Sequence, residues 1–161
     1  MFDLYSERAR QVIFITRLES GARGAEMIGV EDLFAALIVE DQNKISDALS
    51  QRGEAGTFIG LMTHQPFLPP DAATSLLENI RRSLPRSQSI PTSADMAISP
   101  ALGETLAAAI DLREKLQSKE VTPLHLLAVL LAGSHQRVQA LRDAGITEEQ
   151  VLDVIRREDQ L

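Results

Sequence analysis

The sequence predicts an all-α fold in which eight helices form two pseudo-symmetric four-helix repeats within a single domain. The composition, 44% hydrophobic but only 4% aromatic, favours the aliphatic core of helices packed on helices. Apolar residues recur at helical spacing along most of the chain. The helical pattern also repeats 93 positions further on, with the same side chains in three pairs: Leu33 and Leu126, Ala35 and Ala128, and Leu37 and Leu130.

The first repeat covers about residues 5–84. Ser6 can cap its first helix, and Gly21 and Gly24 end that helix. Gly29 opens the second helix, whose inward positions are apolar. Capping residues and helical spacing place the four helices of this repeat: about 6–22, from Gly29 onward, 44–52 and 72–84.

Two segments interrupt the helical pattern. The insertion 54–71 mixes glycine, proline and isolated hydrophobic residues. Its apolar content is too high for a solvated linker, so we expect an ordered excursion that packs back onto the domain. Residues 85–98 are rich in serine and proline, and we expect them to form the joint between the repeats.

The second repeat covers about residues 99–158. Ser99 and Thr122 each provide a capping hydroxyl directly before a proline, which is favoured at the first helical position. The helix after Thr122 is apolar almost all round, so it should be the most deeply buried helix of this repeat. Thr147 and Gln150 match a capping box that starts the last helix.

Composition also limits the function classes. Cysteine is absent, which excludes disulfides, thiolate catalysis and cysteine-ligated zinc. No signal peptide is recognisable, and no apolar run approaches the roughly 20 residues of a membrane-spanning helix. We therefore expect a cytoplasmic protein with no membrane partner. The net charge of −7 disfavours nucleic acid as a partner, and the basic cluster Arg81, Arg82 and Arg86 is interpreted as a solvated helix end.

No catalytic constellation is recognisable, so we expect no catalytic residue, cofactor or bound metal. The pattern Gly-x-x-x-x-Gly-Lys is absent, and the chain cannot be an ATPase on its own. The histidines His64, His125 and His135 are too scattered to be zinc ligands on one helical face. His125 is expected to be a packed or capping histidine. The carboxylates of Glu31 and Asp32 lie in a first helical turn, where the helix dipole accounts for them.

Three segments resemble a known family. Tyr5-Ser-Glu-Arg-Ala-Arg-Gln-Val-Ile and Ile28-Gly-Val-Glu-Asp-Leu-Phe-Ala-Ala-Leu resemble the opening helix and the "I-G-T-E-H-L-L-x-x-L" signature of the Clp N-terminal domain. Val121-Thr-Pro-Leu-His-Leu-Leu-Ala-Val-Leu resembles the same signature in a variant form. The resemblance covers nearly the whole chain except the insertion 54–71. It implies a double repeat of four-helix units, which in Clp unfoldases precedes the ATPase rings and receives substrates or adaptors.

The resemblance also implies candidate binding residues. In members of the family that recognise arginine-phosphorylated proteins, signature glutamates bind the guanidinium and helix starts hold the phosphate. Glu31 matches one such glutamate, and Ser6 and Ser99 lie at capped helix starts that suit a phosphate. The second repeat has Leu124 at the matching position, so at most one site of this kind is expected. The alternative role of Glu31 is to stabilise the helix dipole from the first turn.

Phe14 is a further candidate binding residue. It occupies a helix position that is usually polar in the family, and it lies off the predicted inward stripe. If exposed, Phe14 would form an apolar patch with Ile15 that faces a partner. The alternative is that it packs against the insertion 54–71.

Together these observations predict a non-enzymatic protein-binding domain that recruits substrate proteins or adaptors to a Clp-type ATP-dependent unfoldase or protease. The expected partners are unfolded or tagged substrate proteins, adaptor proteins and the Clp ATPase ring. The alternative is a stand-alone regulator that docks on a Clp ring or protease and tunes its assembly. Both the front domain of a larger unfoldase and a stand-alone family member fit this sequence.

Overall fold

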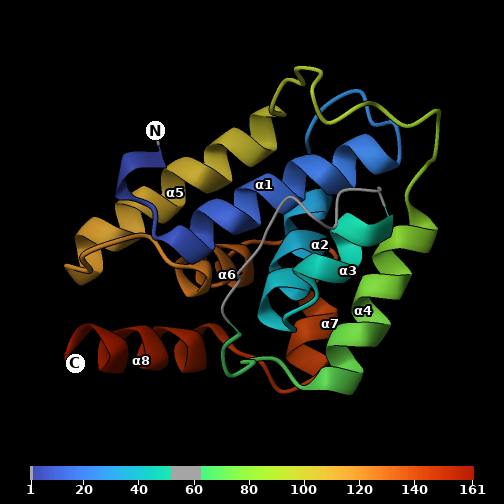
Figure 1. Ribbon diagram of the computed structural model, residues 1–161. Helices are drawn as coiled ribbons and strands as arrows, with labels where there is room; N and C mark the ends of the chain where they lie inside the picture. Colours follow the sequence, from blue (N-terminus) through green and yellow to red (C-terminus); the bar gives the residue numbers. More distant parts are fainter. Residues whose placement is uncertain (1, 52–62) are drawn as a thin grey trace. The chain divides into compact units, whose positions relative to one another are not determined.

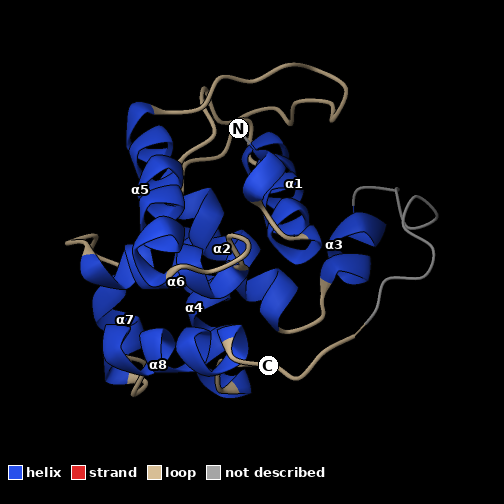
Figure 2. Cartoon of the chain, turned by 90° about the vertical axis from the view of Figure 1, so that its left-hand side faces the viewer, coloured by secondary structure: helices blue, strands red, loops and turns tan. Residues whose placement is uncertain are grey.

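The computed structural model describes residues 2–51 and 63–161 (Figure 1). Over these residues it contains eight α-helices, one short 3-10 helix at Phe2–Leu4 and no strand, which confirms the predicted fold class (Figure 2). The chain divides into two compact units, one formed by residues 1–11 and 98–161 and the other by residues 12–97. The helix α1 (Glu7–Ala22) contributes its first residues to the former unit and the remainder to the latter.

In the unit 98–161, the core forms around α6 (Pro123–Ala132), which packs against α5 (Pro100–Leu116) and α8 (Glu148–Asp159). The short α7 (Val138–Asp143) lies between α6 and α8 in sequence. Most of α6 is buried, as its nearly uniform apolar sequence predicts. The core side chains come from all four helices: Leu102, Leu106, Ala109, Leu126, Leu127, Leu130, Leu131, Val138, Leu141, Val151 and Ile155.

The N-terminal residues of this unit are anchored beside the start of α6. The Ser6 amide donates to the Val121 carbonyl at 2.9 Å, and the Val121 amide donates to the Leu4 carbonyl at 2.7 Å. The buried Tyr5 hydroxyl donates to the Leu106 carbonyl at 3.3 Å. Burial raises the pKa of Tyr5 to about 12. The phenol stays protonated well above physiological pH, and Tyr5 is part of the core of this unit.

In the unit 12–97, α2 (Val30–Asp41) is the central helix and packs against α3 (Ile45–Gln51) and α4 (Pro70–Ser83). Leu33, Phe34, Leu37 and Ile38 are buried as predicted. Three acidic residues of α2 are buried as well: Asp32, Glu40 and Asp41. Buried carboxylates require partners, because desolvating an unpaired charge is costly. Asp41 accepts backbone hydrogen bonds from Phe67 and Leu68 at 2.8 and 3.0 Å.

The described part of the insertion returns to the end of α2. Besides the bonds to Asp41, the imidazole Nε2 of His64 lies 2.9 Å from Oε2 of Glu40. These contacts agree with the expectation that the insertion packs back onto the domain, while residues 54–62 lie outside the described residues. α4 begins two residues earlier than the sequence indicated, at Pro70, because the pair of prolines favours a helix start there.

Residues 85–97, predicted as a joint, are held firmly against the end of α1. The Ser87 amide donates to the Arg23 carbonyl, and the Ile90 amide donates to the Gly21 carbonyl, both at 2.8 Å. Gly24 has a φ of +68°, and a Cβ at this position would clash with the Gln88 carbonyl. We call residues 85–97 the strap. Its backbone bonds fix where its side chains project.

Candidate functional site

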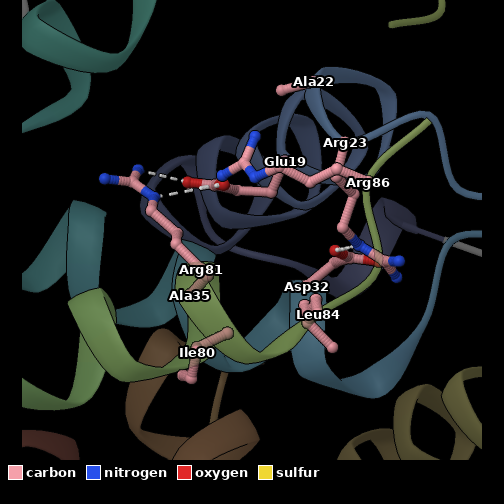
Figure 3. Close-up of a pocket in the computed structure, with 9 residues that line it drawn as sticks. All are labelled: Glu19, Ala22, Arg23, Asp32, Ala35, Ile80, Arg81, Leu84 and Arg86. Carbon is pink, nitrogen blue, oxygen red and sulfur yellow. Dashed lines mark hydrogen bonds and ion pairs between the residues drawn. The ribbon is translucent and has the colours of Figure 1, made fainter. Parts of the chain in front are cut away.

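The unit 12–97 contains a hollow formed by the end of α1, the beginning of α2, the end of α4 and the start of the strap (Figure 3). Apolar side chains and carbons of long charged side chains make up its wall, and Ile80 is fully buried beneath it. The hollow is lined by nine residues: Glu19, Ala22, Arg23, Asp32, Ala35, Ile80, Arg81, Leu84 and Arg86. Three of them are arginines, although the net charge of the protein is −7.

Arg23 and Asp32 form a bidentate ion pair at one side of the hollow. Nε of Arg23 donates to Oδ1 of Asp32 at 2.9 Å, and Nη2 donates to Oδ2 at 3.0 Å. Asp32 is the third residue of α2, so its carboxylate also accepts the Gly29 amide at 2.9 Å. The Asp32 side chain is 1% exposed, while that of Arg23 is 18% exposed. Asp32 therefore caps α2 and fixes Arg23 at the same time.

Arg81 and Glu19 form a second ion pair on the wall of the hollow. Nη2 of Arg81 lies 2.5 Å from Oε1 of Glu19. Arg81 projects from the last turn of α4, while Glu19 comes from the final turns of α1. The pair thus connects α1 to α4. Arg81 and Arg82 lie at a helix end as predicted, but Arg81 is engaged in a tertiary ion pair.

Arg86 is the third guanidinium of the hollow, and it differs from the other two. It is exposed, and it makes no hydrogen bond or ion pair with any residue that the structure describes. Its position follows from the strap, since the neighbouring Ser87 amide is bonded to the Arg23 carbonyl. Two carboxylates neutralise two of the three arginines in the hollow, so its local charge is positive.

A network of hydrogen-bonded side chains in the unit 98–161 runs from the buried His125 and Ser118 to the exposed Asp159. His125, 0% exposed, accepts the Thr122 amide on Nδ1 at 3.0 Å, and its Nε2 lies 2.9 Å from Oγ of Ser118. Ser118 Oγ donates to Oδ2 of Asp159 at 2.5 Å. Because Nδ1 accepts, Nε2 carries the proton and donates to Ser118. Desolvation lowers the pKa of His125, against a raising influence of Asp159.

This hydrogen-bond network contains a serine, a histidine and an aspartate, but its bonds run in the order opposite to that of a hydrolytic triad. In a triad the histidine accepts the serine proton and the aspartate holds the histidine. Here the histidine donates to the serine, and the serine donates to the aspartate. The network therefore stabilises the start of α6, and it leaves Ser118 without an activating base.

The predicted site residues fall into the two units. Ser6 and Ser99, in the unit 98–161 with its N-terminal residues, cap α1 and α5 by accepting the Ala9 and Leu102 amides, each at 3.1 Å. Glu31 and Phe14, in the unit 12–97, are half-buried, and Glu31 lies in the first turn of α2. None of the four lines the hollow. Their roles in binding remain predictions.

One part of the Phe14 prediction is wrong. Ile15, expected to share an exposed apolar patch with Phe14, is 1% exposed. The inward stripe of α1 was predicted at Ala9, Val12, Ile13 and Thr16. It was placed too narrowly, because Ile15 and Ser20 are also buried while Ile13 is only half-buried. Burial on a wider arc than one stripe is typical of a helix that has neighbours on several sides.

Sequence reasoning did not predict the hollow, although it interpreted Asp32, Arg81 and Arg86 separately. Arg23 lies 58 positions before Arg81 in the chain, and helical periodicity carries no information on which charges meet. The capping position of Asp32, three residues after Gly29, was a usable indication of its bond to the backbone. Over the described residues, no group of three or more histidine or acidic side chains is arranged to hold a metal ion. No described helix is long and apolar enough to cross a membrane.

Comparison with known proteins yields no match to a protein-family model and no significant match among curated proteins. Solved structures do match. The N-terminal domain of the caseinolytic protease associated chaperone ClpD from Arabidopsis thaliana is 18% identical, with a TM-score of 0.62 over 96% of each chain. The Hsp104 N-terminal domain from Candida albicans is 13% identical, with a TM-score of 0.61 over 92% of this chain and 87% of that one.

A third structure, from work on a malarial protein secretion system, is 17% identical, with a TM-score of 0.67 over 98% of this chain and 95% of the other. At these identities the likeness concerns the fold. It confirms the fold implied by the sequence resemblance, and it extends over nearly all of the chain. The chain has the fold of the N-terminal domains of Clp and Hsp104 chaperones.

Proposed function

We propose that this chain is a non-enzymatic protein-binding domain that recruits substrate proteins or adaptors to a Clp-type ATP-dependent unfoldase or protease. The observation that carries the proposal is the match of the fold, over 96% of both chains, to the N-terminal domain of a chaperone associated with a caseinolytic protease. The signature segments quoted from the sequence support the same assignment. Its partners would be unfolded or tagged proteins, adaptors and the Clp ATPase ring.

The hollow in the unit 12–97 supports a binding role. It combines small apolar residues with charged groups at its edge, a combination that suits an extended peptide segment. A domain that hands its cargo to a downstream machine requires moderate affinity, so we expect dissociation constants on the order of micromolar. The reversed order of the Ser118–His125–Asp159 chain supports a non-enzymatic role.

Isothermal titration calorimetry tests this proposal. The chain is titrated with a model protein held unfolded by reduction and carboxymethylation, and with the same protein in its native state. We expect saturable binding of the unfolded form at micromolar concentration and none of the native form. A parallel titration uses a Clp adaptor protein.

Absence of binding to both the unfolded protein and the adaptor would overturn the proposal. Binding to purified Clp ring subunits alone, accompanied by a change in ring assembly in analytical ultracentrifugation, would support the regulator instead. Both measurements use the chain as it stands, so they do not depend on any particular residue.

A further inference from the structure

We propose that the hollow beside Arg86 binds a carboxylate of an extended protein segment, with an adjacent aliphatic side chain against its apolar wall. This inference rests on the proposed protein-binding function and specifies the chemical class of segment that is bound. Arg86 would receive the carboxylate. Ala22, Ala35 and Leu84 would contact the aliphatic neighbour.

The first step of the argument is the charge state of the three arginines. Arg23 is neutralised by Asp32 and Arg81 by Glu19, each through a short ion pair. Arg86 lines the same hollow and has no such partner among the described residues. A guanidinium presents a planar fork of donors that matches a carboxylate in two parallel hydrogen bonds. The guanidinium N–H donors of Arg86 therefore fit an anionic group of a ligand.

The second step is preorganisation. An exposed arginine on a mobile segment loses much side-chain and backbone freedom on binding. Arg86 follows the end of α4 directly, and the strap bonds at Ser87 and Ile90 fix the backbone that carries it. The Arg23 and Arg81 side chains are fixed by their own carboxylates. The backbone that carries Arg86 and the other two guanidinium groups are thus in place before a ligand arrives.

The third step concerns the apolar wall. Ala22 and Ala35 are small side chains on the wall of the hollow, and Ala22 also lines a larger hollow that adjoins it. Arg81 and Arg86 also line an adjoining hollow together with Ile15, Leu18 and Ala48. An aliphatic residue next to the acidic residue of a ligand would be removed from water here. A segment that alternates acidic and aliphatic residues satisfies both parts of the site.

The negative charge of the whole protein does not prevent this recognition. At physiological ionic strength the Debye length is about 8 Å, so distant carboxylates are largely screened. The local excess of one guanidinium decides the sign of the field inside the hollow. Binding should consequently weaken as salt is raised, because the decisive contact is an exposed ion pair.

The test uses fluorescence anisotropy with a labelled short peptide that alternates leucine and glutamate. Three control peptides accompany it: one with glutamine in place of glutamate, one with serine in place of leucine, and one with an amidated C-terminus. We expect both the glutamine and the serine peptide to bind about tenfold more weakly. Amidation distinguishes the sources of the carboxylate, since it weakens binding only if the chain end occupies the site.

The protein variants are Arg86→Gln and the matched control Arg82→Gln. Arg82 is an exposed arginine in the last turn of α4 that does not line the hollow. We expect Arg86→Gln to weaken binding of the glutamate peptide about tenfold and to abolish the preference for glutamate over glutamine. Arg82→Gln should change neither value by more than about twofold. Circular dichroism confirms that both variants are folded.

Failure of this inference can be separated from failure of the proposed function. If the chain binds the unfolded model protein but shows no glutamate preference and no response to Arg86→Gln, the inference is overturned while the proposed function stands. If it binds neither the unfolded protein, an adaptor nor the peptide, both are overturned. An equal loss in Arg86→Gln and Arg82→Gln would assign the effect to general charge and would also overturn the inference.

Discussion

The starts of α2 and α6 carry the same capping device with different chemistry. Asp32 and His125 are each the third residue of their helix, 93 positions apart in sequence, and each accepts the amide of the residue before the helix. The acceptor is a carboxylate oxygen at 2.9 Å in α2 and an imidazole nitrogen at 3.0 Å in α6. Beyond this bond the two helix starts differ in every partner.

Asp32 and His125 each have a second bonding partner, and this partner determines the role of the helix start. Asp32 binds a guanidinium at the edge of the hollow, so the start of α2 forms part of a candidate binding surface. His125 binds Ser118, which binds Asp159, so the start of α6 is tied to α8 inside its own unit. The unit 12–97 thus uses this capping residue to organise charge near solvent, and the unit 98–161 uses it to connect helices. The two positions share one backbone bond and support different contacts.

The largest effect should come from His125→Ala. The change removes a fully buried ring, the acceptor for the Thr122 amide and the donor to Ser118. We expect a loss of about 4 kcal/mol in the free energy of unfolding, measured by urea denaturation. His135→Ala, in the loop before α7, is the control and should cost about 1 kcal/mol or less. Equal losses in the two variants would show that His125 does not organise its unit.

The next effect should come from Asp32→Ala, which breaks a bidentate ion pair and removes the cap of α2. We expect a loss of about 3 kcal/mol, near the lower end for a buried pair, because Arg23 retains access to water. The control is Asp153→Ala, whose pair with Arg156 is 65% and 54% exposed and should contribute less than about 0.5 kcal/mol. A loss in Asp32→Ala no larger than that in the control would contradict the role assigned to Asp32.

Ser118→Ala should have a smaller effect. Ser118 links His125 to Asp159, and its removal leaves the buried Nε2 proton of His125 without its acceptor. We expect a loss of about 1–2 kcal/mol in the free energy of unfolding. Ser89→Ala, at an exposed position of the strap, should be neutral. Nuclear magnetic resonance of the His125 ring protons would reveal whether the ring keeps its tautomer, which we expect from the Thr122 bond.

The smallest expected effect is the acid sensitivity that His125 gives to its unit. Because the pKa of His125 is lowered in the folded state, the unfolded chain binds this proton more readily. Its contribution to stability is present above the unfolded pKa of about 6.5 and is lost as the pH falls below that value. Urea denaturation across this range should show the loss, and His125→Asn should flatten it. An unchanged acid dependence in His125→Asn would mean that other groups cause it.

Much of the helical framework could be predicted from the sequence, because it follows from local rules. Ser99 caps α5, and the Thr147–Gln150 capping box starts α8 with both bonds formed, at 3.2 and 3.3 Å. Four apolar residues at helical spacing were predicted to face inward near α4; Leu76, Leu77 and Ile80 are buried, and Leu84, just after the helix, is half-buried. In each case the information lies within a few neighbouring residues.

The candidate site could not be predicted, because its components meet only through tertiary packing. Glu19 and Arg81 are 62 positions apart, and no periodicity relates them. The composition of residues 85–98 indicated a joint, but it could not reveal the backbone bonds of the strap to Gly21 and Arg23. Side-chain patterns describe which face of an element is buried, whereas these bonds depend on main-chain atoms that every residue possesses.

The position of Arg86 depends on Gly24, a residue without a side chain. With its left-handed backbone and no room for a Cβ beneath the Gln88 carbonyl, this glycine permits the strap to approach α1. Any larger residue there would lift the strap and carry the cation away with it. A substitution of Gly24 would therefore displace the proposed carboxylate site without changing any charge, so this uncharged turn residue tests the proposal as directly as the arginine itself.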